Sequence, residues 1–166
     1  MAGTANTASH SAQTSGRQAA RDADTGDDHM ADVRAICAIG LRGQLGLQGG
    51  MPWEGDPRRE FRADVARFFD ITRGHVIAAG PITARSIPAF AREDRTIVEL
   101  RSSDRPDTVI SRFGDRVVFI GGGPSVWTAY ARLIRHWDIT RLPYDGEADR
   151  WFDPAWLTAG GGSDDA

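Results

Sequence analysis

The chain of 166 residues contains one cysteine, Cys37, so the sequence predicts neither an intrachain disulfide nor a paired-cysteine metal site. Its histidines, His10, His29, His75 and His136, lack the spacing of metal ligands, and we expect no bound metal. No apolar run approaches the roughly 20 residues that a membrane-spanning helix needs. The net charge of −3 argues against a basic surface that attracts nucleic acid or anionic lipid.

The two ends of the chain have little apolar surface. Residues 1–31 are rich in Ala, Ser, Thr, Asp and Gly, and we expect a disordered extension there. It is either a native tail or an extension ahead of a start at Met30. It lacks the apolar centre of a secretory signal, so the expected location is cytoplasmic. Residues 32–157 are predicted to form one domain, and residues 158–166 a loose C-terminal tail.

The central part alternates compact apolar runs with helical patterns. Helices are expected from Asp56-Pro57 to about residue 72, from Pro81, around 107–112 and from Pro124. Strands separated by helices of this length predict an α/β fold with a parallel sheet that is covered on both faces. The predicted strands are 33–40, 75–80, 96–100, 116–123 and 137–142.

An acidic residue interrupts the apolar face of the first predicted helix. Asp64 falls inside this face, whereas its neighbours Arg62 and Arg67 are expected to point elsewhere. A carboxylate in such a place costs several kcal/mol unless a polar group meets it. Asp64 therefore either caps a buried backbone group or faces a ligand. The apolar face consists of Phe61, Val65, Phe68, Phe69 and Thr72.

Glycines mark two further segments. The strand at 116–123 runs into Gly121, Gly122 and Gly123, where the missing side chains let the backbone approach a phosphate. The turn follows a central strand, at the edge where open α/β sheets bind ligands, so we predict phosphate or dinucleotide binding. A turn that only permits tight packing is the alternative. The glycine-rich loop 41–53 indicates close backbone approach, mobility or both.

Together, five ordered segments resemble dihydrofolate reductase over about residues 33–154. "ICAIGLRGQLGLQGGMPW" is similar to the family's opening strand and mobile substrate loop, and "ADVARFF" to the helix that carries its catalytic acid. "VIAAGPITARSIP" and "IGGGPSVW" resemble its cofactor segments, and "TRLPYDGEADRWF" keeps the spacing of a later element. The resemblance implies a dihydrofolate-reductase-like sheet and an oxidoreductase that reduces the C=N bond of a dihydropterin in one-carbon metabolism. The implied cofactor is NADPH, with NADH not excluded.

The same resemblance assigns roles to residues. Asp64 is the implied catalytic acid, and Arg92 competes with Arg95 for the substrate tail. The residues expected to bind substrate are Ile36, Cys37, Trp53, Asp64, Phe68, Arg95, Ile120 and Thr140. Those expected to bind the cofactor are Ala38, Leu45, Gly46, Met51, Gly80, Ile82, Thr83, Arg101, Ser102, Gly121, Gly122, Gly123, Ser125 and Val126.

The chain also departs from the family pattern. Pro81 replaces an arginine that commonly meets the cofactor's 2′-phosphate, and we expect Arg101 and Ser102 to substitute. The family's last two strands have no counterpart, which would leave a sheet edge for a second copy in a homo-oligomer. The truncated dihydromethanopterin reductases share this shortening, so dihydromethanopterin is favoured over dihydrofolate. A non-catalytic nucleotide- or pterin-binding module and a plain α/β scaffold for partners are the other readings.

Overall fold

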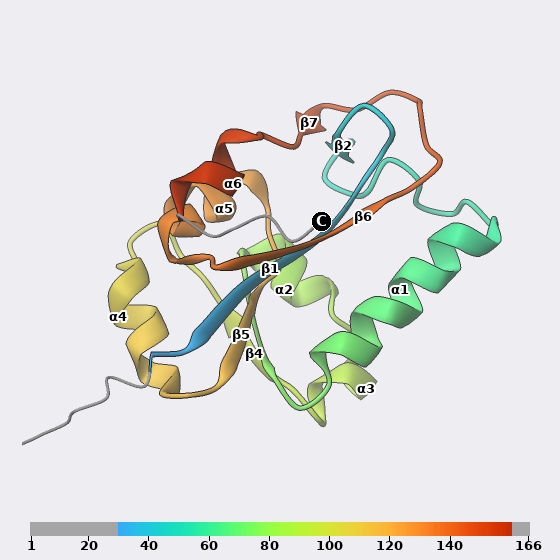
Figure 1. Cartoon of the computed structure of the whole chain (residues 1–166). Helices are drawn as coiled ribbons and strands as arrows, with labels where there is room; N and C mark the ends of the chain where they lie inside the picture. Colours follow the sequence, from blue (N-terminus) through green and yellow to red (C-terminus); the bar gives the residue numbers. More distant parts are fainter. Residues whose placement is uncertain (1–29, 161–166) are drawn as a thin grey trace, which may run out of the picture.

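The computed structural model describes residues 30–160 and contains a five-stranded parallel sheet in the order β4-β3-β5-β1-β6 (Figure 1). Strand pairing follows the apolar runs of the sequence, and the predicted α/β fold class is confirmed. The strands are β1 (Asp32–Ile39), β3 (Val76–Ala79), β4 (Thr96–Glu99), β5 (Val117–Ile120) and β6 (His136–Arg141).

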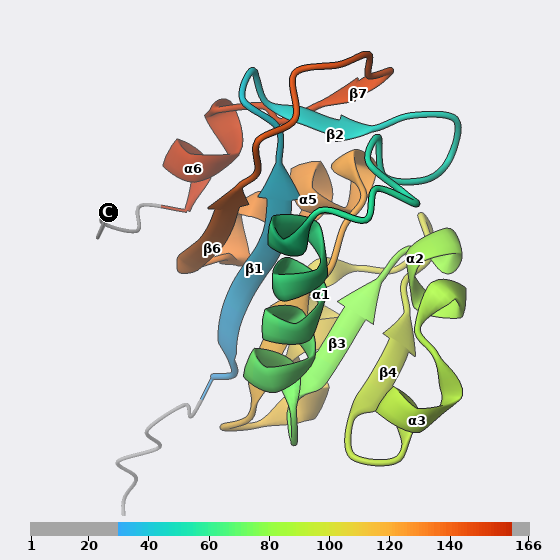
Figure 2. The same ribbon diagram turned by 90° about the vertical axis from the view of Figure 1, so that its right-hand side faces the viewer.

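Helices cover both faces of this sheet. The long helix α1 lies across one face, and α4, α5 and α6 lie on the other (Figures 1 and 2). The helices are α1 (Arg59–Thr72), α2 (Pro81–Ser86), α3 (Ala89–Arg92), α4 (Pro106–Ile110), α5 (Pro124–Tyr130) and α6 (Ala155–Ala159), with 3₁₀ turns η1 (Ser111–Phe113) and η2 (Ala131–Leu133).

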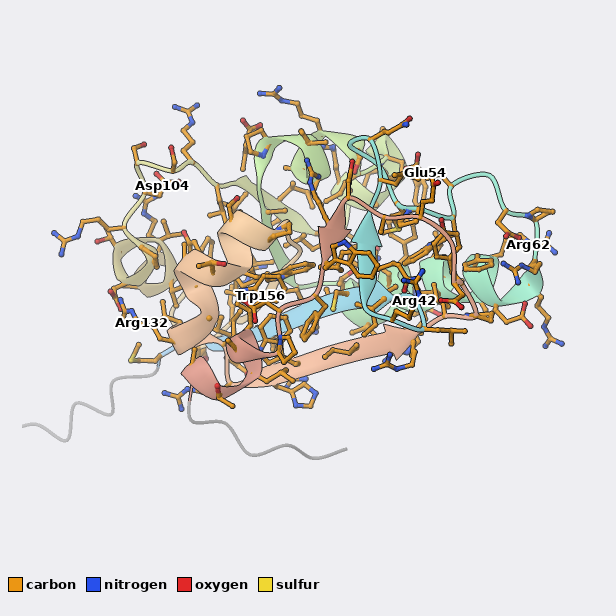
Figure 3. All side chains as sticks on the ribbon, turned by 90° about the horizontal axis from the view of Figure 1, so that it is seen from above. Arg42, Glu54, Arg62, Asp104, Arg132 and Trp156 are labelled. Atoms are coloured by element: carbon orange, nitrogen blue, oxygen red, sulfur yellow. The ribbon has the colours of Figure 1, made fainter. Side chains whose placement is uncertain are left out.

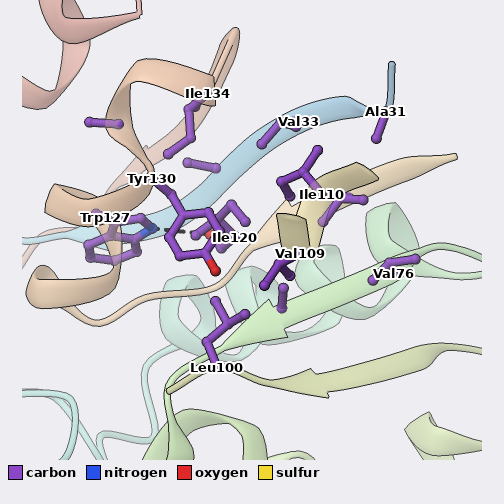
Figure 4. Packing of buried hydrophobic residues seen from close by; sticks show 14 of the residues in the cluster. Ala31, Val33, Val76, Leu100, Val109, Ile110, Ile120, Trp127, Tyr130 and Ile134 are labelled. Carbon is purple, nitrogen blue, oxygen red and sulfur yellow. Dashed lines mark hydrogen bonds between the residues drawn. The ribbon is translucent and has the colours of Figure 1, made fainter. Parts of the chain in front are cut away.

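The larger core lies between the sheet and α4, α5 and α6. Alternate strand residues such as Val118 and Ile120 point into it, and Trp127 and Tyr130 of α5 close it (Figure 4). The indole Nε1 of Trp127 donates a hydrogen bond of 3.1 Å to the carbonyl oxygen of Ile120. The end of β5 is therefore fixed against α5.

A small antiparallel pair, β2 (Gln44–Gly46) with β7 (Arg150–Trp151), was not predicted from the sequence. Gln44 is fully buried, and its Oε1 accepts the backbone N–H of Arg42 at 2.8 Å. Arg42, labelled in Figure 3, donates through Nε to Asp145 at 2.5 Å. These contacts attach the glycine-rich loop to the chain that follows β6.

Several predicted boundaries differ in the structure; the strand expected at 116–123, for example, ends at Ile120. Helix α1 begins at Arg59, because Asp56 accepts the backbone N–H of Arg58 at 3.0 Å instead of capping a helix that starts at Pro57. Helix α6 extends to Ala159, so the predicted loose tail from residue 158 starts inside a helix. The remainder of both predicted terminal segments, residues 1–29 and 161–166, lies outside the described residues.

Strand β6 forms one edge of the sheet. It pairs with β1 along its inner side, and within residues 30–160 no strand pairs with its outer side. The absence of an adjoining hairpin agrees with the sequence-based expectation. In the same residues, no helix is long and apolar enough to span a bilayer.

Candidate active site

Helix α1 brings Asp64 to the sheet at the carboxyl half of β1 and β6. Its carboxyl group is half-buried and lies within hydrogen-bonding reach of the Thr140 hydroxyl on β6. Thr140 pairs with Ala38 of β1, so both residues stand on the face that α1 covers. The carboxyl group of Asp64 therefore faces a polar group of the sheet. This agrees with the sequence-based argument that a carboxylate on an apolar helix face needs a polar partner.

Burial raises the pKa of the Asp64 carboxyl group, and the negative charge of Asp138 adds to the rise. The hydrogen bond from Thr140 and the positive charge of Arg67 act in the opposite direction. A raised pKa increases the protonated fraction near neutral pH. Asp64 is therefore suited to donate a proton.

Arg67 corrects one expectation, because its side chain does not point away from this group. Its Nη1 donates to Oγ1 of Thr140 at 3.1 Å, and its Nη2 donates to Oδ1 of Asp138 at 2.6 Å. Residues three apart on a helix share a face, so Arg67 lies beside Asp64. Asp138 was also missed, although its alternation with Thr140 along a strand was the available signal.

The glycine turn lies on the other side of β1, at the end of β5. The backbone N–H of Gly80 donates to the carbonyl oxygen of Gly122 at 3.0 Å, which joins the ends of β3 and β5. Gly122 has φ of +97°, and a methyl group there would lie 2.8 Å from the Trp127 ring. At Gly123 a methyl group would meet nothing within 4 Å. One side of the turn is packed and the other is open, which fits a backbone cradle for a phosphate group.

Strand β1 lies between β5 and β6, so the acid and the glycine turn flank the same strand. All five strands are parallel, and their carboxyl ends meet at one edge of the sheet. A ligand held by the glycine turn would therefore lie next to the group that Asp64 can protonate. This arrangement suits a reaction between a dinucleotide and a second ligand.

Comparison with known proteins is consistent with this geometry. No protein-family model matches the chain. The chain is 60% identical over 131 residues to a dihydromethanopterin reductase of Methylorubrum extorquens, and the match covers 79% of this chain and 97% of that relative. The chain belongs to the dihydromethanopterin reductase family. The family resemblance predicted from the sequence, including its truncated branch, is confirmed.

In this member of the dihydromethanopterin reductase family, Trp53 is only 6% exposed and stacks on Phe61, with ring centroids 5.8 Å apart. It also packs with Ala38 and Leu142. Met51, two residues earlier, is exposed. Trp53 therefore anchors the end of the glycine-rich loop, whereas Met51 is accessible to a ligand.

Four other residues predicted to bind substrate lie in strands β1 and β5 and in helix α1. The side chain of Cys37 packs with the core on the face opposite α1, and burial raises the pKa of its thiol to about 12. Phe68 of α1 packs against Ile77 of β3. The carbonyl oxygen of Ile120 accepts a hydrogen bond from the Trp127 indole. Ile36 stands on the α1 face of β1, in register with Asp138.

Most of the predicted cofactor residues lie at or just after the carboxyl ends of β1, β3, β4 and β5. Arg101 and Ser102 are exposed just beyond β4, and the Arg101 backbone N–H donates to Asp104 at 2.7 Å. Gly80 lies against Val126, since a methyl group there would be 3.4 Å from that side chain. Ile82, Thr83 and Ser125 belong to the first turns of α2 and α5. Leu45 and Gly46 lie in β2, where Gly46 packs against Arg150.

Arg95 was expected to meet a substrate tail, but its side chain is 2% exposed. Its Nε donates to Oγ1 of Thr72 at 2.9 Å, and Nη1 donates to the Ala91 carbonyl oxygen at 3.1 Å. Further hydrogen bonds go to Asp94 and to the Phe69 carbonyl oxygen. Arg95 thus ties α1, α3 and the start of β4 together, and this geometry favours a structural role over the predicted one.

The alternative to Arg95, Arg92, is exposed and also bonds its own chain. Its Nε donates to the Ile87 carbonyl oxygen at 3.1 Å and its Nη2 to that of Ala84 at 2.5 Å. The choice between the two arginines stays a prediction. Within the described part of the chain, no group of three or more His, Cys, Asp or Glu side chains could hold a metal ion.

Replacing Arg95 by methionine should lower the free energy of unfolding by about 2–4 kcal/mol, because buried oxygens of Phe69, Ala91 and Thr72 lose their donor. Urea unfolding followed by tryptophan fluorescence measures this loss. The matched control is Arg62→Met, an exposed arginine on α1, which should change it little. If the free energy of unfolding were unchanged and KM for the pterin rose strongly, Arg95 would have the predicted role of binding the substrate.

Proposed function

We propose that the chain reduces a dihydropterin to the tetrahydropterin with a reduced nicotinamide nucleotide, and that dihydromethanopterin is the preferred substrate. The observation that carries the proposal is the half-buried Asp64 beside Thr140, one strand away from the glycine turn. The 60% identity to a dihydromethanopterin reductase supports the choice of substrate. Dihydrofolate is the second candidate, because its reactive ring is closely similar.

The residues of the chain would divide the work of the reaction. A reduced nicotinamide nucleotide, when bound, would supply a hydride to C6 of the pterin and be oxidised, while N5 would receive a proton. Asp64 holds that proton on the α1 side of β1, and Thr140 orients the carboxyl group. The backbone carbonyl groups of Ile36 and Ile120 would accept N–H groups of the pterin.

The glycine turn fits the phosphates of a dinucleotide, since Gly123 is open where Gly122 is packed. For the 2′-phosphate of NADPH we favour Arg101 and Ser102, which are exposed at the end of β4. Met51, exposed in the loop that Trp53 anchors, would shield the reacting atoms from water. A role in one-carbon metabolism and a cytoplasmic location remain predictions.

A second copy of the chain is the proposed occupant of the free edge of β6. The strand is six residues long, and its outer backbone groups lack a strand partner in the described residues. The edges of two β6 strands can pair antiparallel around a two-fold axis, so that the outer backbone groups of both strands gain hydrogen-bond partners. This homo-oligomer is a proposal that is separate from the chemistry.

The substrate proposal is tested by steady-state kinetics with dihydromethanopterin and dihydrofolate side by side, each with NADPH and with NADH. Loss of the reduced nicotinamide absorbance measures the rate. We expect the largest kcat/KM for dihydromethanopterin with NADPH. A larger value for dihydrofolate would reverse the order of substrates, and nucleotide binding without turnover of either pterin would favour a non-catalytic module.

Asp64→Asn should lower kcat/KM at neutral pH by orders of magnitude, because the amide cannot donate the proton. Nucleotide affinity should be nearly unchanged. The pKa of Asp64 is higher in the folded chain, so ionisation at neutral pH costs folding free energy that the variant avoids. Its free energy of unfolding at pH 7 should be equal to or above that of the parent. A variant that turns over at the parent rate would remove Asp64 from the chemistry.

A further inference from the structure

Arg67 connects helix α1 to two residues of β6. Its two terminal nitrogens lie 3.1 Å from Oγ1 of Thr140 and 2.6 Å from Oδ1 of Asp138. Asp138 and Thr140 are two residues apart on one strand, and therefore project from the same face. The Asp138 side chain is 18% exposed and that of Arg67 is 44% exposed, so the pair lies at the margin of the site.

The contact with Arg67 gives the Thr140 hydroxyl a direction. A hydroxyl group has one hydrogen and two lone pairs, and one lone pair accepts the Arg67 guanidinium. Its hydrogen is then available for a different acceptor. The half-buried carboxyl group of Asp64 lies nearby, and the Thr140 hydroxyl opposes the rise in its pKa, which is the effect of a donor to the carboxylate. With the Thr140 hydroxyl turned this way, the donors would run from Arg67 to Thr140 and from Thr140 to Asp64.

The charges around Asp64 come from two elements. Arg67 on α1 carries a positive charge, and Asp138 on β6 carries a negative one. Cys37 on β1 packs on the opposite face of the sheet, and it adds no charge at neutral pH because burial raises the pKa of its thiol to about 12. Removing either charged member of the pair leaves the other uncompensated beside Asp64, and the two removals have opposite electrostatic effects.

We propose that Arg67 and Asp138 form a positioning pair for the catalytic acid, which orients the Thr140 hydroxyl and balances the charge beside Asp64. This inference rests on the proposed function, in which Asp64 delivers the proton. The competing explanation is a plain ion pair that fastens α1 to β6. An ion pair this exposed contributes little to stability. If it only fastened α1 to β6, removing either residue would have no systematic effect on the pKa of Asp64.

The test uses Arg67→Met and Asp138→Asn in the full chain. Protonated Asp64 is required, so kcat/KM falls at high pH as the acid ionises. Arg67→Met leaves an uncompensated Asp138, raises the pKa of Asp64 and moves this fall to higher pH. Asp138→Asn leaves an uncompensated Arg67, lowers the pKa of Asp64 and moves the fall to lower pH. The quantity compared is kcat/KM well above neutral pH divided by the low-pH plateau of the same enzyme. Relative to the parent, this ratio should be severalfold higher in Arg67→Met and severalfold lower in Asp138→Asn.

Arg67→Lys separates charge from orientation. It keeps the positive charge and should leave the fall at its parent pH, while the weaker contact with Thr140 lowers the plateau. The matched control is the exposed pair of Asp70 in the last turn of α1 and Arg73 just after that helix, 3.5 Å apart. Asp70→Asn and Arg73→Met should move neither the plateau nor the fall.

An NMR titration of the Asp64 carboxyl carbon measures the same shifts without substrate or nucleotide. A parent chain that reduces no dihydropterin contradicts the proposed function, yet this titration still tests the pair. Opposite shifts of the Asp64 titration in the two variants support the inference. Shifts in the same direction, or no shift in folded variants with parent-like circular dichroism, overturn it.

Discussion

The parallel pairing of β1 with β5 on one side and β6 on the other is the constraint on which the site depends. It aligns Ala35 with Ile120 and Ala38 with Thr140, so that the glycine turn and the polar end of β6 flank one strand. Parallel strands need long crossover connections, and the chain uses these for α1 and α5. One of these helices carries the acid, and the other packs against the glycine turn.

The acid is held in a balance of opposing effects. Partial burial favours the protonated carboxyl group, whereas the Thr140 hydroxyl and the Arg67 guanidinium favour the carboxylate. A fully buried acid would stay neutral and release its proton reluctantly, and a solvated one would lose it well below neutral pH. A half-buried position next to a paired arginine and aspartate lies between these limits. The charged groups of this pair, Arg67 and Asp138, make no large contribution to the stability of the fold.

Much of the fold could be predicted because its signals are local. The five apolar runs became the five strands of the sheet, and prolines marked the starts of α2 and α5. The strands β2 and β7 are short, and the buried Gln44 of β2 donates to the carbonyl oxygen of Gly146, about 100 residues away in the sequence. Arg95 resembled a substrate-binding arginine in sequence, and the structure shows that it also donates to carbonyl oxygens of its own chain. The direction of the Arg67 side chain also depends on β6, which lies about 70 residues away.

In the proposed reaction, Asp64 and the glycine turn bring a pterin and a nicotinamide nucleotide together for direct hydride transfer. Isotope transfer tests it most directly, with a nucleotide that carries deuterium in both positions at C4 of its dihydronicotinamide ring. After a single turnover in ordinary water, mass spectrometry should find one deuterium in the tetrahydropterin, on the carbon of the reduced C=N bond. A tetrahydropterin without deuterium would show that its hydrogen came from elsewhere, and would contradict the account.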